Sequence, residues 1–265
     1  MSDKKVILIT GATDGLGKGV ALALAMKGHH LLLHGRDPKR GQVLIADIIK
    51  ATGNKNLRYY NADFSELAQI KELAIQIIEK EPKLDVLINN AGLGIEPTKR
   101  ISKEGNEMLW QVNYLGTYML TKLLQPLLEK SKPARIVQVA SAGQAPLLFE
   151  DINQNKVWSG MQAYCQSKLA QIMLTIEIGE EFGKSGVIVN ALHPASMMPT
   201  KIVQHVIDNL SEGVDAVVKL AIDTSLNNVT GKYFFKQLQL KANPTAYSEE
   251  NRKKLMQLSV EMTGV

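Results

Sequence analysis

The sequence holds a single cysteine, only 5% aromatic residues, no long apolar run and no block of basic residues. One cysteine, Cys165, excludes an intrachain disulfide and suits a reducing compartment, so we expect a cytoplasmic protein. No apolar stretch approaches the roughly 18 residues of a membrane span. The first five residues lead into a short apolar run without the h-region of a signal peptide. We therefore expect neither secretion nor a membrane span.

Charge and histidine spacing exclude two further classes of protein. Lys and Arg number 31 against 26 Asp and Glu, which gives a formal charge of +5. This excess is spread along the chain and is not interleaved with aromatic residues as in single-strand binders, so we expect no nucleic-acid partner. The five histidines lack ligand spacing such as His-Glu-x-x-His, and no metal site is expected.

Short aliphatic runs alternate with longer amphipathic ones over most of the 265 residues. The aliphatic runs are nearly continuous, as in strands buried on both faces of a parallel sheet. We predict strands at residues 6–10, 30–34, 57–61, 84–89, 134–140, 187–192 and 232–235. We predict helices at residues 16–27, 40–51, 66–79, 103–113, 114–130 and 162–182.

This alternation predicts an α/β fold with a single Rossmann-type, doubly wound parallel sheet and helices on both faces. No Pro/Gly/Ser-rich linker interrupts the pattern, so residues 1–265 are expected to form one dinucleotide-binding domain. Residues 194–228 read as helical and are expected to cover the carboxyl edge of the sheet, where ligands bind in such folds.

A glycine-rich segment, residues 10–17, follows the first predicted strand and leads into a helix. Gly11 permits a sharp turn, Gly15 lets the backbone approach a pyrophosphate, and Gly17 allows close packing of helix and strand. Backbone N–H groups and the positive end of the helix dipole at Leu16 would hold the anion. Glycine spacing alone is a weak signal, but its position after the first strand predicts dinucleotide binding. The predicted cofactor contacts here are Gly11, Thr13, Asp14, Gly15 and Leu16.

The end of the second predicted strand bears on which dinucleotide binds. An NAD site usually places Asp or Glu about 20 residues beyond the glycines, on the ribose 2′-hydroxyl. If Gly35 occupies that position, there is room for a 2′-phosphate, which the guanidinium of Arg36 can meet. Lys39 and Arg40 add positive potential nearby. A shift of one residue would put Asp37 on the 2′-hydroxyl instead, so we favour NADP(H) over NAD(H) with Asp37 as the counterargument.

Asp63 and Phe64 follow the third predicted strand and are predicted cofactor contacts. The carboxylate of Asp63 is suited to bonding the adenine edge. An alternative, compatible with the first, is that Asp63 caps the helix expected to begin near Ser65.

Tyr164 and Lys168 stand four residues apart in a predicted helix and so share one face. A tyrosine with a pKa of about 10 is a poor base at neutral pH. A neighbouring ammonium favours the phenolate and lowers that pKa, as an oxidised nicotinamide would. Tyr164 could then give a proton to a carbonyl or take one from an alcohol. Tyr-x-x-x-Lys alone is a frequent coincidence, so its meaning depends on other residues.

Three other groups stand where the same site would need them. Ser141 lies just beyond the fifth predicted strand, at its carboxyl end. Residues 89–92, Asn-Asn-Ala-Gly, follow the fourth strand, and the small Ala91 and Gly92 would let a ribose lie against the backbone. Asn113 supplies an amide that could hold a bent helix and a bound water. The predicted cofactor contacts of this group are Asn90, Ala91 and Gly92.

In combination and in this order, the motifs resemble the short-chain dehydrogenase/reductase superfamily over about residues 6–233. The resemblance implies a catalytic tetrad of Asn113, Ser141, Tyr164 and Lys168. It implies that Tyr164 is the acid/base and that Ser141 orients the carbonyl. Lys168 would bind the nicotinamide ribose and lower the tyrosine pKa, and Asn113 would hold a proton-relay water.

The resemblance also implies cofactor contacts beyond the glycine turn. Tyr164 and Lys168 would contact the nicotinamide ribose, and Pro194 follows the sixth predicted strand within a His-Pro pair. Thr200 falls where family members bond the carboxamide. The family's Pro-Gly is Pro194-Ala195 here. This departure from the family's pattern would constrain the backbone beside the nicotinamide.

A narrower resemblance is to the retinol-dehydrogenase-like subgroup. It rests on residues 160–170, on the long interval between Ser141 and Tyr164, and on residues 231–235 followed by a terminal helix. Such members are often NADP(H)-dependent and act on retinoids, steroids or lipid aldehydes, which implies a fairly apolar carbonyl or alcohol substrate. The amino-terminal anchor of the membrane-bound members is absent, so a soluble enzyme with another substrate is also expected.

The sequence therefore predicts an NAD(P)-dependent oxidoreductase that acts on a small molecule. Residues 113–130 and 162–182 resemble the helices that pair in family dimers and tetramers, so a homodimer or homotetramer is expected. One alternative is an NADP(H)-binding sensor or scaffold without turnover, against which the intact tetrad argues. Another is a nucleotide-sugar epimerase or dehydratase, for whose longer carboxyl-terminal domain this chain has little room.

Overall fold

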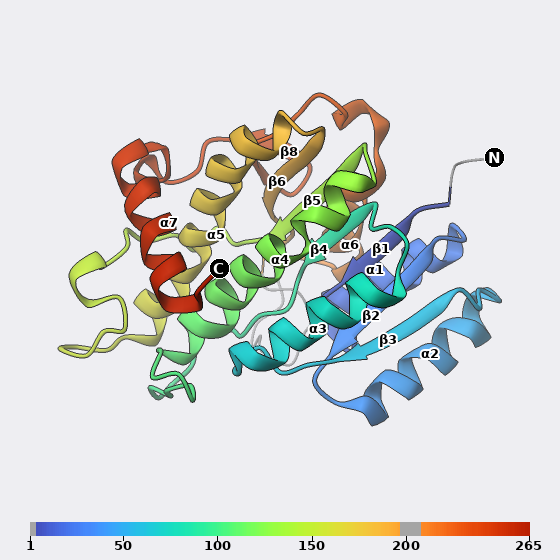
Figure 1. The fold of residues 1–265 in the computed structure, drawn as a ribbon, viewed down its shortest axis with the longest axis horizontal. Coiled ribbons are helices and arrows are strands. Elements are labelled where there is room, and N and C mark those ends of the chain that lie inside the picture. The colour runs from blue at the N-terminus through green and yellow to red at the C-terminus, as the bar shows by residue number, and fades with distance from the viewer. Residues whose placement is uncertain (1–3, 197–207) are drawn as a thin grey trace.

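Eight strands form one sheet in the computed structural model, which describes residues 4–196 and 208–265 (Figure 1). The strands are β1 (Val6–Ile9), β2 (His30–Gly35), β3 (Leu57–Asn61), β4 (Val86–Asn89), β5 (Ala134–Val139), β6 (Val187–His193), β7 (Lys232–Phe235) and β8 (Leu238–Leu240). Their order is β3-β2-β1-β4-β5-β6-β7-β8, and every neighbouring pair is parallel except β7 and β8. The predicted doubly wound sheet is confirmed. From β1 the strand order runs outward to β2 and β3 on one side and to β4, β5 and β6 on the other, so the topological switch point lies between β1 and β4.

Helices cover both faces of the sheet. The long helices are α1 (Gly15–Met26), α2 (Pro38–Thr52), α3 (Leu67–Lys80), α4 (Gly116–Lys130), α5 (Gly160–Gly183), α6 (Leu210–Ile222) and α7 (Glu249–Thr263). One core lies between the sheet and α1, α2 and α6, and the other between the sheet and α3, α4 and α5. All residues of β1, β4 and β5 are buried, which explains why these strands read as unbroken aliphatic runs.

The helix predicted at residues 103–113 is wrong over its first half. Residues 102–106 form a tight turn in which Ser102 donates its backbone N–H to the carbonyl of Asn106, at 2.8 Å. Gly105 adopts a φ of +83°, which an α-helix does not permit. The helix begins only at Met108, and it opens into a π-helical turn, Trp110–Leu115, that runs on into α4.

The carboxyl-terminal helix α7 packs across α5 and the π-helical turn (Figure 1). The hydroxyls of Tyr114 and Ser259 lie 2.7 Å apart, both buried. The guanidinium of Arg252 donates to the carboxylate of Glu177 on α5 at 2.8 Å. Because α7 covers it, α5 is buried around almost its whole circumference.

Residues 194–228, predicted to cover the carboxyl edge, fall into two parts. Helix α6 packs against α1 on one face of the sheet. Residues 197–207 lie outside the described residues. Ser196 and Asp208, on either side of them, are joined by a hydrogen bond from the backbone N–H of Ser196 to the carboxylate, at 2.6 Å.

Candidate active site

The glycine turn between β1 and α1 has no space for a side chain at its glycine positions. Gly11 and Gly15 have φ values of +65° and +48°. A Cβ on Gly11 would lie 2.8 Å from Cα of Ala91, and one on Gly17 would lie 2.3 Å from the carbonyl oxygen of Gly11. These positions therefore accept only glycine, and they leave backbone surface where a pyrophosphate needs it.

Thr13, Asp14 and Leu16 fill the rest of this turn. The carboxylate of Asp14 accepts the N–H of Gly15 at 2.9 Å, so it caps α1. Leu16 is 7% exposed and anchors the first helical turn in the core. The amino end of α1 thus lies at the carboxyl edge of the sheet, as an anion site requires.

Asn90 fastens the turn to the loop after β4. Its amide Nδ2 donates to the carbonyls of Thr10 at 2.8 Å and Gly11 at 3.1 Å. The hydroxyl of Thr10 accepts the backbone N–H groups of Asn90 and Ala91, both at 2.9 Å. Asn90 and Thr10 therefore hold the glycine turn against the loop after β4.

His34 supports the same turn from β2, a role that no pattern in the sequence indicated. Its Nδ1 accepts the backbone N–H of Gly11 at 3.3 Å, and its Nε2 lies 3.0 Å from the carbonyl of Ala62. The ring stacks on Phe64 with centroids 4.7 Å apart. Burial lowers the pKa of His34 to about 4, so the ring is neutral at pH 7 and can accept this bond.

The end of β2 leaves no room for an acidic side chain at Gly35. A Cβ there would lie 2.8 Å from Cγ2 of Thr13 and 2.9 Å from the hydroxyl of Tyr59. Arg36, the next residue, is exposed.

Asp37 and Arg40 lie just beyond. The carboxylate of Asp37 accepts the backbone N–H groups of Lys39 at 2.8 Å and Arg40 at 3.2 Å, and so caps α2. The guanidinium of Arg40 reaches back to the glycine turn, where it donates to the carbonyl of Thr13 at 3.1 Å and to the carboxylate of Asp14 at 2.9 Å. Arg40 is thus closer to the predicted cofactor site than its place in the sequence suggested.

Asp63 forms a local turn rather than the cap of a long helix. Its carboxylate accepts the N–H of Ser65 at 2.9 Å, and α3 begins two residues later. The N–H of Leu67, at the start of α3, is instead bonded by the carboxylate of Glu104 at 2.7 Å. Phe64 is 4% exposed, and it contributes to the wall formed with His34.

Asn113 lies in the π-helical turn and is fully buried. Its Oδ1 accepts the N–H of Leu93 at 2.7 Å, and its Nδ2 donates to the carbonyl of Leu93 and to the hydroxyl of Ser167, both at 3.1 Å. A Cβ on Gly92 would lie 3.1 Å from Oδ1 of Asn113. The amide therefore joins the loop after β4 to α5, as a residue holding a bent helix would.

Ser141 and Tyr164 meet at the carboxyl edge of the sheet. Ser141 follows β5, and its Oγ accepts the N–H of Gly143 at 3.0 Å. Burial raises the pKa of Tyr164, and a hydrogen bond with the side chain of Ser141 lowers it by less. The sequence predicted a lowered pKa from Lys168, but the removal of the phenol from water has the larger effect and raises the pKa of Tyr164.

Lys168 lies one helical turn beyond Tyr164, with Nζ 5.8 Å from the centroid of the phenol ring. Its ammonium donates to the carbonyl of Val139 at 3.0 Å and to Oε1 of Gln171 at 3.1 Å. Burial lowers the pKa of Lys168 to about 8. The predicted face shared by Tyr164 and Lys168 is therefore formed, with the loop after β4 close by, because a Cβ on Gly92 would lie 3.5 Å from this Nζ.

Two residues that the sequence did not single out fix the backbone of Ser141. The hydroxyl of Tyr233, on β7, donates to the carbonyl of Ser141 at 3.1 Å. Nε2 of Gln144 donates to the same carbonyl at 3.0 Å, and Oε1 of Gln144 accepts the N–H of Asn243 at 2.7 Å. Only their three-dimensional neighbours reveal this role, since the residues come from three separate parts of the chain.

Pro194 is buried directly after β6, at the same edge of the sheet. Thr200, predicted to bond the carboxamide, lies outside the described residues. Within residues 4–196 and 208–265 no group of three or more His, Cys, Asp or Glu side chains could hold a metal ion. No helix in that part of the chain is long and apolar enough to cross a membrane.

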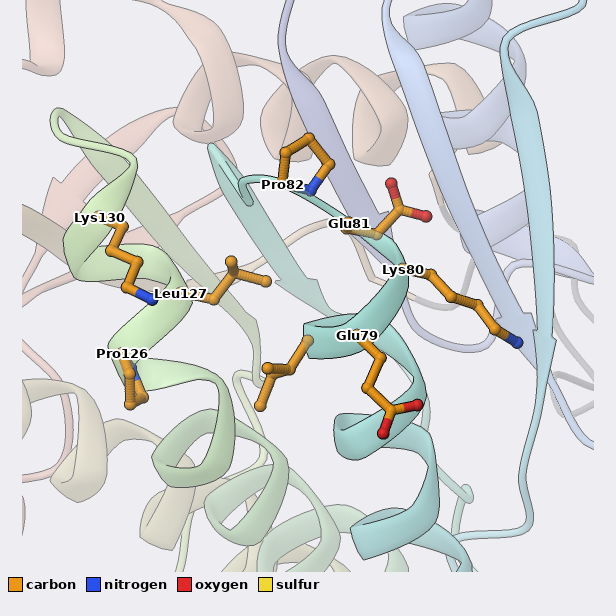
Figure 2. Close-up of a pocket in the computed structure, with 8 residues that line it drawn as sticks. Glu79, Lys80, Glu81, Pro82, Pro126, Leu127 and Lys130 are labelled. Carbon is orange, nitrogen blue, oxygen red and sulfur yellow. The ribbon is translucent and has the colours of Figure 1, made fainter.

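The surface groove of about 430 Å³ drawn in Figure 2 does not belong to this site. It lies between the end of α3 and the last turns of α4, with Glu79 on one side and Leu127 and Lys130 on the other. These residues precede β4 and β5, so the groove lies at the amino edge of the sheet.

The residues at the carboxyl edge fit a dinucleotide. The glycine turn would hold the pyrophosphate against backbone that no Cβ covers, and a Cβ on Gly92 would lie 3.5 Å from the ammonium of Lys168. Tyr164 lies beside this ammonium, and the side chain of Ser141 bonds Tyr164. Asn113, the fourth residue of the predicted tetrad, donates a hydrogen bond to Ser167, which precedes Lys168 on α5.

Comparisons with known proteins agree with this arrangement. A family model described as short chain dehydrogenase matches residues 5–211. Retinol dehydrogenase 13 of Mus musculus is 34% identical over 98% of this chain and 84% of its own length. A crystal structure of an uncharacterized protein from Mycobacterium paratuberculosis superposes with a TM-score of 0.82 at 24% identity, over 98% of this chain and 94% of the other.

A second structure with the same fold is the NADP active-site complex of RhlG from Pseudomonas aeruginosa. Its TM-score is 0.72 at 22% identity, over 87% of this chain and 94% of that one. The family match covers most of the chain, and the relative at 34% identity spans nearly all of it. The chain belongs to the short-chain dehydrogenase family and is similar to its retinol dehydrogenases.

Proposed function

We propose that the protein transfers a hydride between NADP(H) and the carbonyl or alcohol carbon of a fairly apolar substrate, such as a retinoid, a steroid, or a lipid aldehyde or ketone. The observation that carries the proposal is the grouping of Ser141, Tyr164 and Lys168 at the sheet edge that also holds the glycine turn. We propose further that the whole chain acts as one domain in the cytoplasm and that residues 194–228 contribute to the cover of the site.

Ser141, Tyr164 and Lys168 each have one task in this reaction. Bound NADPH supplies the hydride, and the protein aligns the reacting carbon and supplies one proton. The hydroxyl of Ser141 orients the substrate carbonyl, and Tyr164 donates the proton to its oxygen. Burial raises the pKa of Tyr164, which keeps the phenol protonated and suits it to the reductive direction. In the oxidative direction, the positive charge of Lys168 favours the phenolate.

The preference for NADP(H) is supported by the end of β2. Gly35 admits no acidic side chain, and the carboxylate of Asp37 is engaged by the backbone of α2. The guanidinium of Arg40 lies beside the glycine turn, and Arg36 is exposed directly after Gly35. A guanidinium binds a phosphate through two parallel hydrogen bonds. The balance of charge at this corner therefore favours a 2′-phosphate.

An apolar substrate is supported by the segment before α5. This segment runs along the first turns of α5, since Ala145 bonds the carbonyl of Cys165 at 3.4 Å and Leu148 bonds the side chain of Gln166 at 3.3 Å. Leu148 and Met161 expose 42% and 56% of their surface there. Exposed apolar side chains beside Tyr164 suit an apolar ligand, and the name of the mouse relative points to the same class.

The decisive experiment follows NADPH absorbance with a panel of aldehydes, retinoids, steroids and quinones. Tyr164→Phe removes the proton donor, and we expect turnover to fall at least about 100-fold while NADPH affinity stays within twofold. Tyr118→Phe, on α4, loses only a hydrogen bond from its hydroxyl to the carbonyl of Val265, so it is the matched control and keeps full turnover. If no substrate gives turnover that depends on Tyr164, the protein is a cofactor sensor or scaffold instead.

The cofactor proposal has its own test. We expect the wild type to bind NADPH more tightly than NADH and Arg36→Leu to lose at least about tenfold of that preference, because one charge-assisted bond to phosphate is removed. Lys50→Leu, at the far end of α2, removes one positive charge without touching the corner. An unchanged preference in Arg36→Leu would remove Arg36 from the 2′-phosphate and leave Arg40 as the candidate.

A further inference from the structure

The ammonium of Lys168 is held by two acceptors inside the protein. Lys168 is 5% exposed, and its Nζ donates to the carbonyl of Val139 on β5 and to Oε1 of Gln171. An ammonium has three N–H donors, so one remains for a ligand. The direction of that third donor is fixed by the positions of the two acceptors.

Of the two acceptors of the Lys168 ammonium, the side-chain acceptor is Oε1 of Gln171. Gln171 lies on α5 one turn beyond Lys168 and is fully buried. Its Nε2 lies 3.5 Å from the hydroxyl of Thr117 on α4, one turn beyond Asn113. Because an ammonium can only donate, the amide oxygen must face Lys168, and the nitrogen is left to face Thr117. Gln171 thus connects Lys168 to the helix that follows Asn113.

The acceptor is neutral, which matters at a buried ammonium. A carboxylate at this position would attract the ammonium as an ion pair and strongly favour its charged form. An aliphatic side chain would leave one buried N–H group without an acceptor, which is unfavourable. An amide holds the direction of the ammonium and leaves its charge free to act on a neighbour.

We propose that Gln171 is a positioning residue of the active site, which holds the ammonium of Lys168 so that its third N–H faces the ligand cleft. The role of Lys168 rests on the proposed function, whereas its contact with Gln171 is a hydrogen bond between two side chains of the protein. Gln171 touches neither the substrate nor the reacting atoms, and it acts through Lys168 alone.

A second buried glutamine offers a matched control. Gln138 lies on β5 and is also fully buried, and neither atom of its amide has a hydrogen-bond partner among the described residues. Gln138→Leu and Gln171→Leu are the same chemical change at the same degree of burial. Only the second removes an acceptor from Lys168.

The first measurement needs neither cofactor nor substrate. The titration of Lys168 is followed by NMR of ¹³Cε-labelled lysine, with its signal assigned by its loss in Lys168→Met. We expect Gln171→Leu to lower the pKa of Lys168 by about one unit and Gln171→Glu to raise it by at least as much, since the two changes act on the charged form in opposite directions. Gln138→Leu leaves the titration unchanged. If Gln171→Leu does not fold, Gln171→Met, which keeps the length of the side chain, takes its place.

The second measurement separates this proposal from the proposed function. With NADPH and a substrate, we expect Gln171→Leu to lower kcat about tenfold or more and to move the pH profile in the direction of the NMR titration, with KM for the substrate within twofold. Loss of turnover in Tyr164→Phe tests the proposed function independently. If that loss occurs while Lys168 titrates alike in the wild type, Gln171→Leu and Gln171→Glu, Gln171 is only a packing residue and the proposal fails.

Discussion

Two basic side chains of the site, His34 and Lys168, are buried, and burial favours the uncharged form of each. The pKa of Lys168 falls to about 8, so at neutral pH the ammonium keeps most of its charge. The pKa of His34 falls to about 4, so its ring is neutral. Neutrality matters because a protonated imidazole has no acceptor for the N–H of Gly11. The glycine turn therefore depends on a histidine that stays uncharged.

This dependence predicts how stability changes with acidity. Below pH 6.5 the unfolded chain takes up a proton at His34, whereas the folded protein does not until about pH 4. Stability is therefore lost as the pH falls through 6.5. Between pH 7 and pH 5, the loss from this residue is about 2 kcal/mol.

The variant that checks it is His34→Gln, whose amide can accept from Gly11 and donate to Ala62 without titrating. Urea unfolding at pH 7 and pH 5 should show a smaller loss in the variant than in the wild type, by about 2 kcal/mol. The remaining slope includes His193, whose pKa burial also lowers to about 4. His30→Gln, at the other end of β2, is the control. An identical slope in His34→Gln and wild type would contradict the neutral role.

At the scale of elements, one buried carboxylate joins the two helical segments that carry Asn113, Tyr164 and Lys168. Glu107 is 1% exposed, and its carboxylate accepts the N–H of Trp110 at 2.8 Å, in the turn that leads to Asn113. The same carboxylate accepts the indole N–H of Trp158 at 3.4 Å. Trp158 stands directly before Ser159, whose hydroxyl caps α5. Both helix starts are therefore tied to a single side chain.

Glu107→Gln should loosen this junction. The amide offers one acceptor oxygen and adds a donor among N–H groups, so we expect a loss of about 1–3 kcal/mol in the free energy of unfolding. Both tryptophans of the chain contact Glu107 through an N–H group, so their fluorescence spectrum should change as well. Glu180→Gln, exposed on α5, is the matched control and leaves both signals unaltered. An unchanged spectrum in Glu107→Gln would show that the carboxylate does not hold Trp158.

The strands that the sequence predicted agree closely with the structure, including β3 and β7, which are only partly buried. The strands expected at residues 57–61 and 232–235 have these bounds in the structure, and the five others agree within two residues. Strand β8 was missed because it is only three residues long, so its Leu-Gln-Leu pattern is too short to indicate a strand. The first half of the helix expected at residues 103–113 is absent because the tight turn at residues 102–106 interrupts an amphipathic pattern.

The site was predictable wherever a residue follows a strand directly. Ser141, Asn90 and the glycine turn come from strand ends, and parallel strands bring such ends to one edge. Contacts between distant segments, such as Gln171 with Thr117, depend on how α4 and α5 pack and leave no local pattern. The raised pKa of Tyr164 belongs with them, since spacing shows a neighbouring lysine and not the depth of burial.

At the scale of the whole molecule, α7 lies on the helices through which the resemblance led us to expect subunits to pair. Leu255 of α7 is completely buried in the core shared with α4 and α5, and Tyr118 of α4 donates to the carbonyl of Val265 at 2.8 Å. The homodimer or homotetramer stays a prediction. An assembly through this face would have to contact the outer surface of α7, because its inner surface is already covered by the chain itself.

If α7 covers the face of α4 and α5 in place of a second subunit, its inner surface should contribute more to the free energy of unfolding than its outer surface. Leu255→Ala opens a cavity under α7 and should lower the free energy of unfolding by about 2–5 kcal/mol. Val260, 49% exposed on the same helix, should tolerate Val260→Ala with a change within about 0.5 kcal/mol. Alanine favours a helix at least as well as either residue, so a difference between the variants reports packing and not helix formation. Denaturant unfolding at one protein concentration measures the free energy of unfolding of both variants. Light scattering checks that the number of subunits is the same in each. Equal losses would mean that α7 is held by its outer surface, and the face of α4 and α5 would then be available to a second copy.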